Sequence, residues 1–276
     1  MLTTASESSA TFLANRATGH IGLSVKAAEG VTRRAEVHEH GSLRARFPNT
    51  HDGALEAVIV NTGGGMTGGD RFGIDIAVGE GARFVATTAA AEKIYRSTGP
   101  DAELSVTLEV AKDARLGWLP QETILFDSAR LSRRIDVNLA EGASLIMAEA
   151  IVFGRAAMGE VMREGRVADR WRLKRGGRLV YADSARLDGA IADRLAHAAV
   201  ANDGIAIATV LIAPGGEAEL SAVRALEQQF AGEVGISAWN GIAVARLCAR
   251  DGAVLRRDLI EILTALGVVV PRSWLQ

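Results

Sequence analysis

The chain has 276 residues and a mass of 29.0 kDa, enough for one or two domains at about 150 residues per domain. Hydrophobic residues make up 48% and charged residues 23%, which excludes fibrous and intrinsically disordered classes. A formal net charge of -2 provides no overall attraction to nucleic acid. The single cysteine, Cys248, excludes an internal disulfide and a Cys-x-x-Cys metal site.

The N-terminal segment is small and polar, and we expect residues 1–16 to be disordered. The first ten residues have neither the basic start nor the apolar run of a signal peptide. No uncharged stretch reaches the roughly 18 apolar residues that a membrane span needs. The sequence therefore predicts a soluble cytoplasmic protein that binds neither membranes nor nucleic acid.

The first half of the chain has the residue alternation of β-strands. Apolar residues recur at every second position in segments 21–25 and 72–78. The segment between these two, Asn61–Asp70, is rich in glycine. The chain as a whole has 30 glycines and only 5 prolines, which suits many short strands joined by tight turns.

An internal repeat of about thirty residues is the most informative regularity. Four similar segments align on Ala82, Ala114, Ala143 and Gly177, with offsets of 32, 29 and 34 residues. Each reads as a strand, a short turn that holds Gly or Asp, and a second strand. Stacked repeats of this kind bury their apolar faces on their neighbours. We therefore predict a mainly β fold, an irregular β-solenoid or β-helix-like stack of short strands.

Helical periodicity is confined to the later part of the chain. It occurs near residues 190–230 and 253–266, where Leu259 and Ile262 lie on an apolar face. No linker or low-complexity segment interrupts the sequence. We therefore expect a single domain over residues 1–276, with a small α-helical layer on the β stack.

The glycine-rich segment formally contains the Gly-x-Gly-x-x-Gly motif at residues 63–68. Dinucleotide binding needs a helix to begin there, so that its N-terminus can hold the pyrophosphate. A strand pattern follows instead, and Asp70 would repel a phosphate. A loop with positive φ angles, or one that another chain approaches closely, explains the glycines better.

Three polar segments are candidates for function. The first contains Lys93, Tyr95 and Arg96, residue types that are common in protein interfaces, although a solvated turn would look the same. The second, Trp118–Asp127, contains two carboxylates but has no nucleophile or histidine nearby, so general acid–base catalysis is weakly supported. The third, from Arg155 to Arg186, holds nine basic residues, among them Arg178. It is either a solvated strand face or a surface for an acidic partner.

His38-Glu39-His40 could form a metal clip. On a strand, residues i and i+2 project to the same face, so both imidazoles could reach one borderline-soft metal ion. Exposed pairs of this kind are usually incidental, and both interpretations stay open.

Four blocks of the sequence, in order and spacing, resemble the UreD (UreH) family of urease accessory proteins over roughly residues 20 to 272. The blocks are Asn61–Asp70, Ala89–Ser97, Leu119–Asp127 and Phe153–Glu160. The first block usually has fewer consecutive glycines in that family. The His38/His40 pair lies outside the resemblance.

The resemblance implies a mostly β stack with a few helices and no enzyme activity. Such proteins act as scaffolds or chaperones in nickel insertion. They bind the urease apoprotein and, through the accessory protein UreF, recruit the GTPase UreG, which carries nickel; GTP hydrolysis then drives nickel into the urease active site. No tightly bound cofactor is expected, and a homodimer within the complex is compatible with this role.

If nickel passes through the chain, carboxylates within or beside the matching blocks could relay it weakly, namely Asp70, Glu122, Asp127, Glu149 and Asp183. Candidate partner-binding residues are Lys93, Tyr95, Arg96, Arg155, Arg178, Leu259 and Ile262.

Two alternatives to the scaffold function remain at this point. One is a small-molecule enzyme on a β scaffold, which nucleotide binding or turnover by the chain alone would reveal. The other is a nickel-storage protein, which tight stoichiometric binding would reveal.

Overall fold

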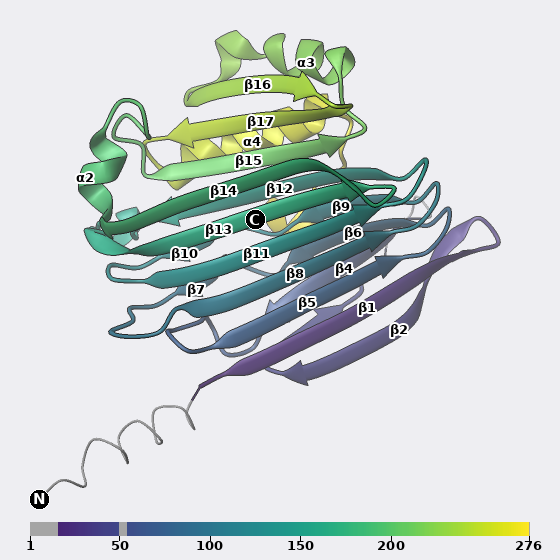
Figure 1. Ribbon diagram of the computed structural model, residues 1–276, viewed down its shortest axis with the longest axis horizontal. Helices are drawn as coiled ribbons and strands as arrows, with labels where there is room; N and C mark the ends of the chain where they lie inside the picture. Colours follow the sequence, from purple (N-terminus) through teal and green to yellow (C-terminus); the bar gives the residue numbers. More distant parts are fainter. Residues whose placement is uncertain (1–15, 50–53, 276) are drawn as a thin grey trace, which may run out of the picture.

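The structure is a computed structural model that describes residues 16–49 and 54–275, so the expected disordered segment lies, except for Arg16, outside the described residues. Two large sheets face each other and form a β-solenoid of about four turns (Figure 1). Strands account for 54% and helices for 14%, which confirms the mainly β fold class.

One wall of the solenoid is a seven-stranded sheet. Strands β1, β5, β8, β11 and β13 run parallel to one another, and the edge strands β2 and β14 run antiparallel to their neighbours. From edge to edge, the order is β14 (Arg178–Ala190), β13 (Glu164–Arg175), β11 (Arg130–Leu139), β8 (Ala102–Val110), β5 (Arg71–Val78), β1 (Thr18–Ala28) and β2 (Val31–Gly41).

The other wall belongs to a ten-stranded sheet. Its main path is β16 (Glu233–Trp239), β17 (Ile242–Ala249), β15 (Ala206–Ala213), β12 (Ser144–Phe153), β9 (Arg115–Leu119), β6 (Arg83–Thr88), β4 (Leu55–Asn61) and β3 (Leu43–Arg46). Two short strands, β7 (Glu92–Ile94) and β10 (Thr123–Leu125), pair with each other in parallel, and β10 also pairs with the end of β12. They form a narrow third side, visible where β7 and β10 are labelled in Figure 1.

The tight turns between the two walls fall where the repeat predicts them. The chain passes from β5 to β6, from β8 to β9 and from β11 to β12 through turns that place Gly81, Asp113 and Gly142 at φ of 66°, 55° and 70°. The left-handed backbone at this position explains why each repeat carries Gly or Asp there. Backbone hydrogen bonds connect successive turns, from the Gly81 amide to the Lys112 carbonyl (3.0 Å) and from the Asp113 amide to the Glu141 carbonyl (3.2 Å).

The fourth predicted repeat has a different structure. Around Gly177, β13 and β14 form an antiparallel hairpin within the seven-stranded sheet, with Arg175 opposite Arg178. The chain does not cross to the other wall at this point. A strand–glycine turn–strand sequence fits a hairpin as well as a coil, so the repeat analysis was wrong in treating this unit as another turn of the solenoid.

The core between the walls is built from ladders of equivalent residues. Leu108 lies beside Ile76 on one side and Val137 on the other, and all three are at most 2% exposed. Phe84 and Leu116 form a similar pair on the opposite wall. Each coil therefore buries its apolar side chains against the coils above and below, as expected for stacked repeats.

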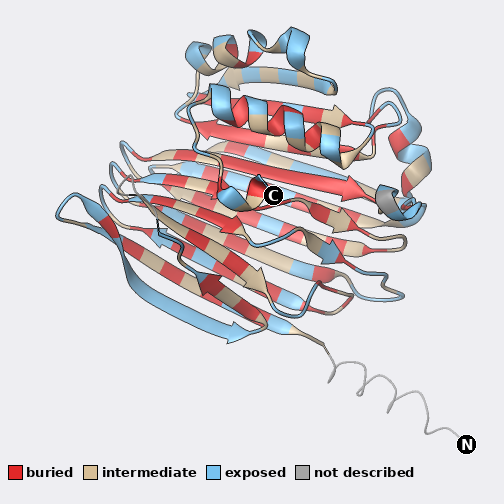
Figure 2. Ribbon diagram, turned by 180° about the vertical axis from the view of Figure 1, so that it is seen from behind, coloured by how far each residue is buried: buried red, intermediate tan, exposed pale blue. Residues whose placement is uncertain are grey.

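A helical layer covers the outer face of the ten-stranded sheet around β15 and β17 (Figure 2). Helix α4 (Gly252–Ala265) packs there, and its Leu259 and Ile262 are 1% and 0% exposed. The prediction that these two residues contact partners is therefore wrong, because both side chains attach the helix to its own sheet. The other helical segments are α2 (Ile191–Ala196), α3 (Glu217–Arg224) and the 3-10 turns η1 (Ala156–Met158), η2 (Glu227–Gln229) and η3 (Arg272–Trp274).

Among the described residues, none of the helices combines the length and the apolar character needed to span a bilayer.

The ladders predict a strong dependence of stability on single core residues. Ile135 on β11 is fully buried, and we expect Ile135→Ala to lower the free energy of unfolding by about 2–5 kcal/mol because it leaves a cavity that rigid neighbouring coils cannot fill. Arg134→Ala, on the solvent face of the same strand, should change it by about 0.5 kcal/mol or less. Urea unfolding followed by circular dichroism measures both values, and equal values for the two variants would contradict the ladder packing.

Candidate functional site

The glycine-rich segment 61–70 packs tightly against the next coil. The Met66 amide donates to the Lys93 carbonyl, and the Tyr95 amide donates to the Met66 carbonyl, both at 2.7 Å. A Cβ on Gly65 would lie 2.4 Å from the Tyr95 ring, and one on Gly68 would lie 1.9 Å from the Ser97 hydroxyl. No helix begins in this segment, and Gly64, Gly65 and Gly69 have φ of 75°, 150° and 90°, so the expectation of a loop with positive φ angles is confirmed. The close approach comes from the next coil of the same chain.

The four sequence blocks meet at one corner of the solenoid. The Tyr95 hydroxyl of the second block donates to the Gly64 carbonyl of the first block at 2.9 Å. The Tyr95 ring meets Phe126 of the third block edge to face, with 4.9 Å between centroids. The Arg155 guanidinium of the fourth block lies 4.1 Å from the centroid of the Phe126 ring. We call the surface formed by Gly64, Tyr95, Phe126 and Arg155 the motif corner.

The motif corner is open to solvent and partly apolar. Tyr95 is 37% exposed, and in the adjoining loop Met158 is 73% and Val161 is 50% exposed. Lys93 and Arg96 are also exposed beside Tyr95. Exposed aromatic, Met and Arg side chains in one place are typical of protein interfaces. The structure thus brings together four of the predicted partner-binding residues, Lys93, Tyr95, Arg96 and Arg155.

Two of the predicted relay acids hold the loops of the motif corner in place. Asp70 is 4% exposed and accepts hydrogen bonds from the backbone amides of Ala17 (2.8 Å) and Thr67 (2.7 Å). Asp127 accepts from the backbone amide of Arg163 at 2.7 Å, which fastens the loop that follows β12. Both carboxylates thus satisfy backbone donors of their own chain.

A third relay acid, Glu122, ties the helical layer to the solenoid. Arg256 of α4 donates to the Glu122 carboxylate at 2.9 Å, to the Gln121 side chain at 2.9 Å and to the Trp274 carbonyl at 3.1 Å. The Trp274 indole donates to the Leu119 carbonyl at 3.0 Å. These contacts fix the third sequence block between the last residues of the chain and the coil.

Arg178 and Asp183 lie away from the motif corner. Arg178 follows the β13–β14 turn, at the opposite ends of the strands from Tyr95. Asp183 on β14 accepts hydrogen bonds from Arg246 (2.7 Å) and from the Tyr181 hydroxyl (2.9 Å). Burial alone would raise the pKa of Asp183, but these two hydrogen bonds lower it below its ordinary value.

The interior contains a buried ion cluster centred on Arg133. Its guanidinium pairs with Glu149 of β12 and with Asp169 of β13, the latter at 2.6 Å, and all three residues are 8% exposed or less. Two indoles complete the cluster, as Trp118 donates to Glu149 at 2.7 Å and Trp171 donates to Asp169 at 3.0 Å. Burial raises the pKa of Glu149, although Arg133 opposes this effect.

A cavity of about 150 Å³ adjoins this cluster and extends toward the motif corner. Glu149 and Arg133 line it, and so do Glu92, Asn61 and Thr88. The Asn61 amide donates to Glu92 at 3.0 Å. Burial raises the pKa of Glu92 to about 7, against the lowering effect of this hydrogen bond. The cavity thus offers two carboxylates whose charge is poorly solvated.

The sequence analysis missed Glu92 and Arg133 as functional candidates. Glu92 lies inside a recognised block but has the ordinary look of a turn residue, and Arg133 looks like one more exposed arginine of a strand. In the arrangement that the structure shows, the described residues place no three His, Cys, Asp or Glu side chains where they could hold a metal ion together. The five predicted relay acids lie on separate elements, and of these only Glu149 lines the cavity.

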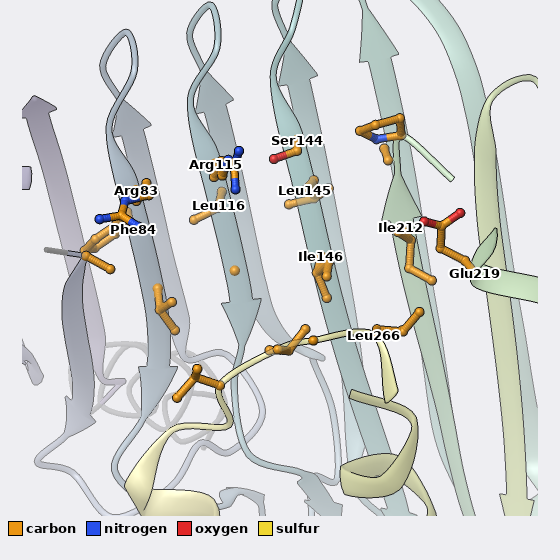
Figure 3. A pocket seen from close by; sticks show the side chains of 18 of the residues that line it. Arg83, Phe84, Arg115, Leu116, Ser144, Leu145, Ile146, Ile212, Glu219 and Leu266 are labelled. Carbon is orange, nitrogen blue, oxygen red and sulfur yellow. The ribbon is translucent and has the colours of Figure 1, made fainter. Parts of the chain in front are cut away.

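A larger groove of about 820 Å³ crosses the outer face of the ten-stranded sheet (Figure 3). Ile146 and Ile212 form part of its floor, and Leu266 lies in the segment that follows α4 along its side. Arg115 and Ser144 lie toward the tight turns. The groove is apolar at its centre and has no assembled set of reactive groups.

Comparison with known proteins decides between the open interpretations at the level of the family. A family model described as "UreD urease accessory protein" matches residues 17–274. The urease accessory protein UreD of Rhodopseudomonas palustris strain HaA2 is 57% identical over 273 residues, which cover 99% of this chain and 98% of that protein. The chain belongs to the UreD family of urease accessory proteins. UreD of Bradyrhizobium diazoefficiens strain USDA 110 is 55% identical over 270 residues, which cover 98% of each chain.

The UreD match spans both structural parts of the chain. It begins at Ala17, whose amide binds Asp70, and ends at Trp274, whose indole binds the third sequence block. The four blocks that carried the resemblance thus lie within one continuous family unit of solenoid and helical layer.

Glu92 gives this UreD chain a defined pH dependence of stability. In the unfolded chain its pKa is near 4.5, and in the folded chain it is about 7, so between these values the folded chain retains a proton that the unfolded chain loses. The contribution of Glu92 to stability is therefore present at low pH and falls as the pH rises through this window. We therefore compare the free energy of unfolding of Glu92→Gln with that of the native chain at each pH. The variant should gain on the native chain by on the order of 1–3 kcal/mol between pH 4.5 and pH 8. Urea unfolding of both proteins at the two pH values measures this, and an effect independent of pH would contradict it.

Proposed function

We propose that this chain is a scaffold of urease maturation that acts in the cytoplasm and catalyses no reaction itself. It binds the urease apoprotein and, through UreF, recruits the nickel-carrying GTPase UreG, so that GTP hydrolysis can drive nickel into the urease active site. Membership of the UreD family supports this role. The observation that carries the proposal is the motif corner, where the four sequence blocks form one exposed, partly apolar surface on a rigid stack of coils.

The motif corner is the partner-binding surface in this proposal. Its aromatic and guanidinium groups are held in place by contacts between coils, so binding orders few side chains and loses little conformational entropy. The exposed Met158 and Val161 supply apolar area beside the charged Lys93 and Arg96. Polar groups around an apolar centre are the usual composition of a specific protein interface.

A substitution in the motif corner tests the scaffold. We expect Met158→Asp to weaken binding of UreF or of the urease apoprotein by about tenfold or more, because it places a charge in a desolvated contact. The measurement is co-expression with the three partners, followed by size-exclusion chromatography and quantitative pull-down. Val269→Asp is the matched control, since Val269 is 81% exposed and lies beside the groove on the outer face of the ten-stranded sheet. Native-like assembly of Met158→Asp with both partners would contradict the proposed interface.

Passage of nickel through the chain is the second part of the proposal. The cavity between Glu92 and Glu149 would accept the ion from one bound partner and release it to the other, with carboxylate oxygens as weak ligands. Asp70, Glu122, Asp127 and Asp183 already bind donors of their own chain, so their share in the relay would need those hydrogen bonds to open. No nickel is retained as a cofactor in this scheme.

Glu92→Gln tests the relay apart from the scaffold. The amide keeps the size of the side chain and its contact with Asn61 but removes the negative charge, so we expect several-fold lower nickel content of urease with the complex still assembled. Nickel per urease active site after co-expression is the measured quantity. Glu141→Gln, in an exposed turn, is the control and should leave loading unchanged. If Glu92→Gln loads urease as the native chain does, the cavity is not the route.

A further inference from the structure

Three histidines of the described chain gather on the solvent face of the seven-stranded sheet. His20 on β1 lies directly opposite His40 on β2, and His38 lies opposite Gly22. On these strands Ile21 and Leu23 point into the core, so His20 and its alternate neighbours point outward. Since Cβ atoms of directly opposed residues are about 4.5–5.5 Å apart, the three imidazoles share one small area of the sheet.

Glycines leave the centre of this area open. A Cβ added at Gly22 would lie 3.7 Å from His38 Cδ2 and 3.8 Å from His20 Cε1, so both rings border the same empty position above Gly22. On the other side of His20, β5 contributes Gly73, and the His20 ring lies over it. A larger residue at Gly22 would fill the position that the His20 and His38 rings border, and a Cβ on Gly73 would lie 2.8 Å from His20 Cδ2 and displace that ring.

A carboxylate already orients one of the rings. His20 Nε2 lies 2.8 Å from Asp75 Oδ2 on β5, and Asp75 is the neighbour of Gly22 in the parallel register. In the described part of the chain Nδ1 of His20 has no hydrogen-bond partner, so it remains available to a ligand. A histidine whose second nitrogen binds a carboxylate is the usual arrangement of metal-binding imidazoles, because the carboxylate fixes the ring and raises its basicity.

We propose that His20, His38 and His40 form a surface site for one borderline divalent cation such as Ni²⁺ or Zn²⁺, with Asp75 as the positioning residue of His20. His38 and His40 supply the i, i+2 pair on β2, and His20 completes the site from β1. The described residues do not hold three ligands in place, so binding requires rotation of exposed side chains and gives a weak, exchangeable site. Imidazole ligands select Ni²⁺, Cu²⁺ and Zn²⁺ over Mg²⁺ and Ca²⁺.

The position of the site makes it independent of the proposed interior route. Nearly the whole length of β2 is exposed (Figure 2), with Thr32 as its only buried residue. The two histidines of β2 therefore contribute little to the core, and their removal should leave the fold intact. A charged and polar edge strand also prevents edge-to-edge association of sheets. If the histidines of β2 served only to prevent this association, the chain would bind no metal ion there, so a metal titration separates the two roles.

The test is a titration of the full-length chain, purified without a histidine tag, with NiCl₂ and separately with ZnCl₂ and MgCl₂ in an isothermal calorimeter. We expect one Ni²⁺ per chain, affinity lower by at least about tenfold in the double variant His38→Ala/His40→Ala, and no binding of Mg²⁺. Asp75→Asn, which keeps all three imidazoles, should lower the affinity by roughly tenfold. His197→Ala, in the segment after α2, is the control and should bind as the native chain does.

A second measurement identifies the ligands directly. Ni²⁺ should protect His20, His38 and His40, but not His197, from modification by diethyl pyrocarbonate, as mapped by mass spectrometry. Unchanged far-UV circular dichroism and Tm would show that the double variant is folded. Native-like Ni²⁺ affinity in this folded variant, or no Ni²⁺ binding by the native chain, would overturn the proposal.

Discussion

The backbone hydrogen bonds between successive coils are the constraint on which the rest of the structure depends. They force each coil to follow the path of the one before it, so residues about thirty positions apart in sequence become direct neighbours in space. Leu108 lies between Ile76 and Val137 for this reason, and the turns at Gly81 and Asp113 repeat the same left-handed backbone. A stack of this kind has little freedom to deform, because a shift in one coil would break the ladder on both of its sides.

The same constraint explains why separate sequence blocks form one surface. Gly64, Tyr95, Phe126 and Arg155 are spaced by one coil each, and they follow one another along a single corner. Three carboxylates in these blocks hold this arrangement together: Asp70 and Asp127 bind backbone amides, and Glu122 binds Arg256. An exposed corner built by contacts between coils is suited to holding partners in fixed relative positions.

Sequence reasoning predicted what depends on local repetition and failed where tertiary context decides. The period of the repeat predicted the β-solenoid and its turns, and the strand pattern after Asp70 predicted a loop at the glycine segment, because each follows from a short pattern. It could not separate the Gly177 hairpin from a coil, since both need the same turn residue. Leu259 and Ile262 were mistaken for a binding face because an apolar helix stripe looks the same whether its own sheet or a partner covers it. The burial of Arg133 was invisible for a related reason, since its strand carries arginines on both faces.

The buried cluster around Arg133 connects the rigidity of the stack with its interior chemistry. Arg133 on β11 reaches Glu149 on the opposite wall and Asp169 on the next coil, so a single guanidinium joins three strands of two coils. A shift of one residue in the register of β12 or β13 would turn either carboxylate out of the interior and leave Arg133 charged and unpaired. We infer that the cluster specifies the register of the last parallel coil, next to the hairpin where the repeat ends.

With two acids for one arginine, the cluster leaves one carboxylate without a full counter-charge, and Glu149, which faces the cavity, has the raised pKa. The ion pairs that fix the coil thus also place a poorly neutralised carboxylate at the cavity.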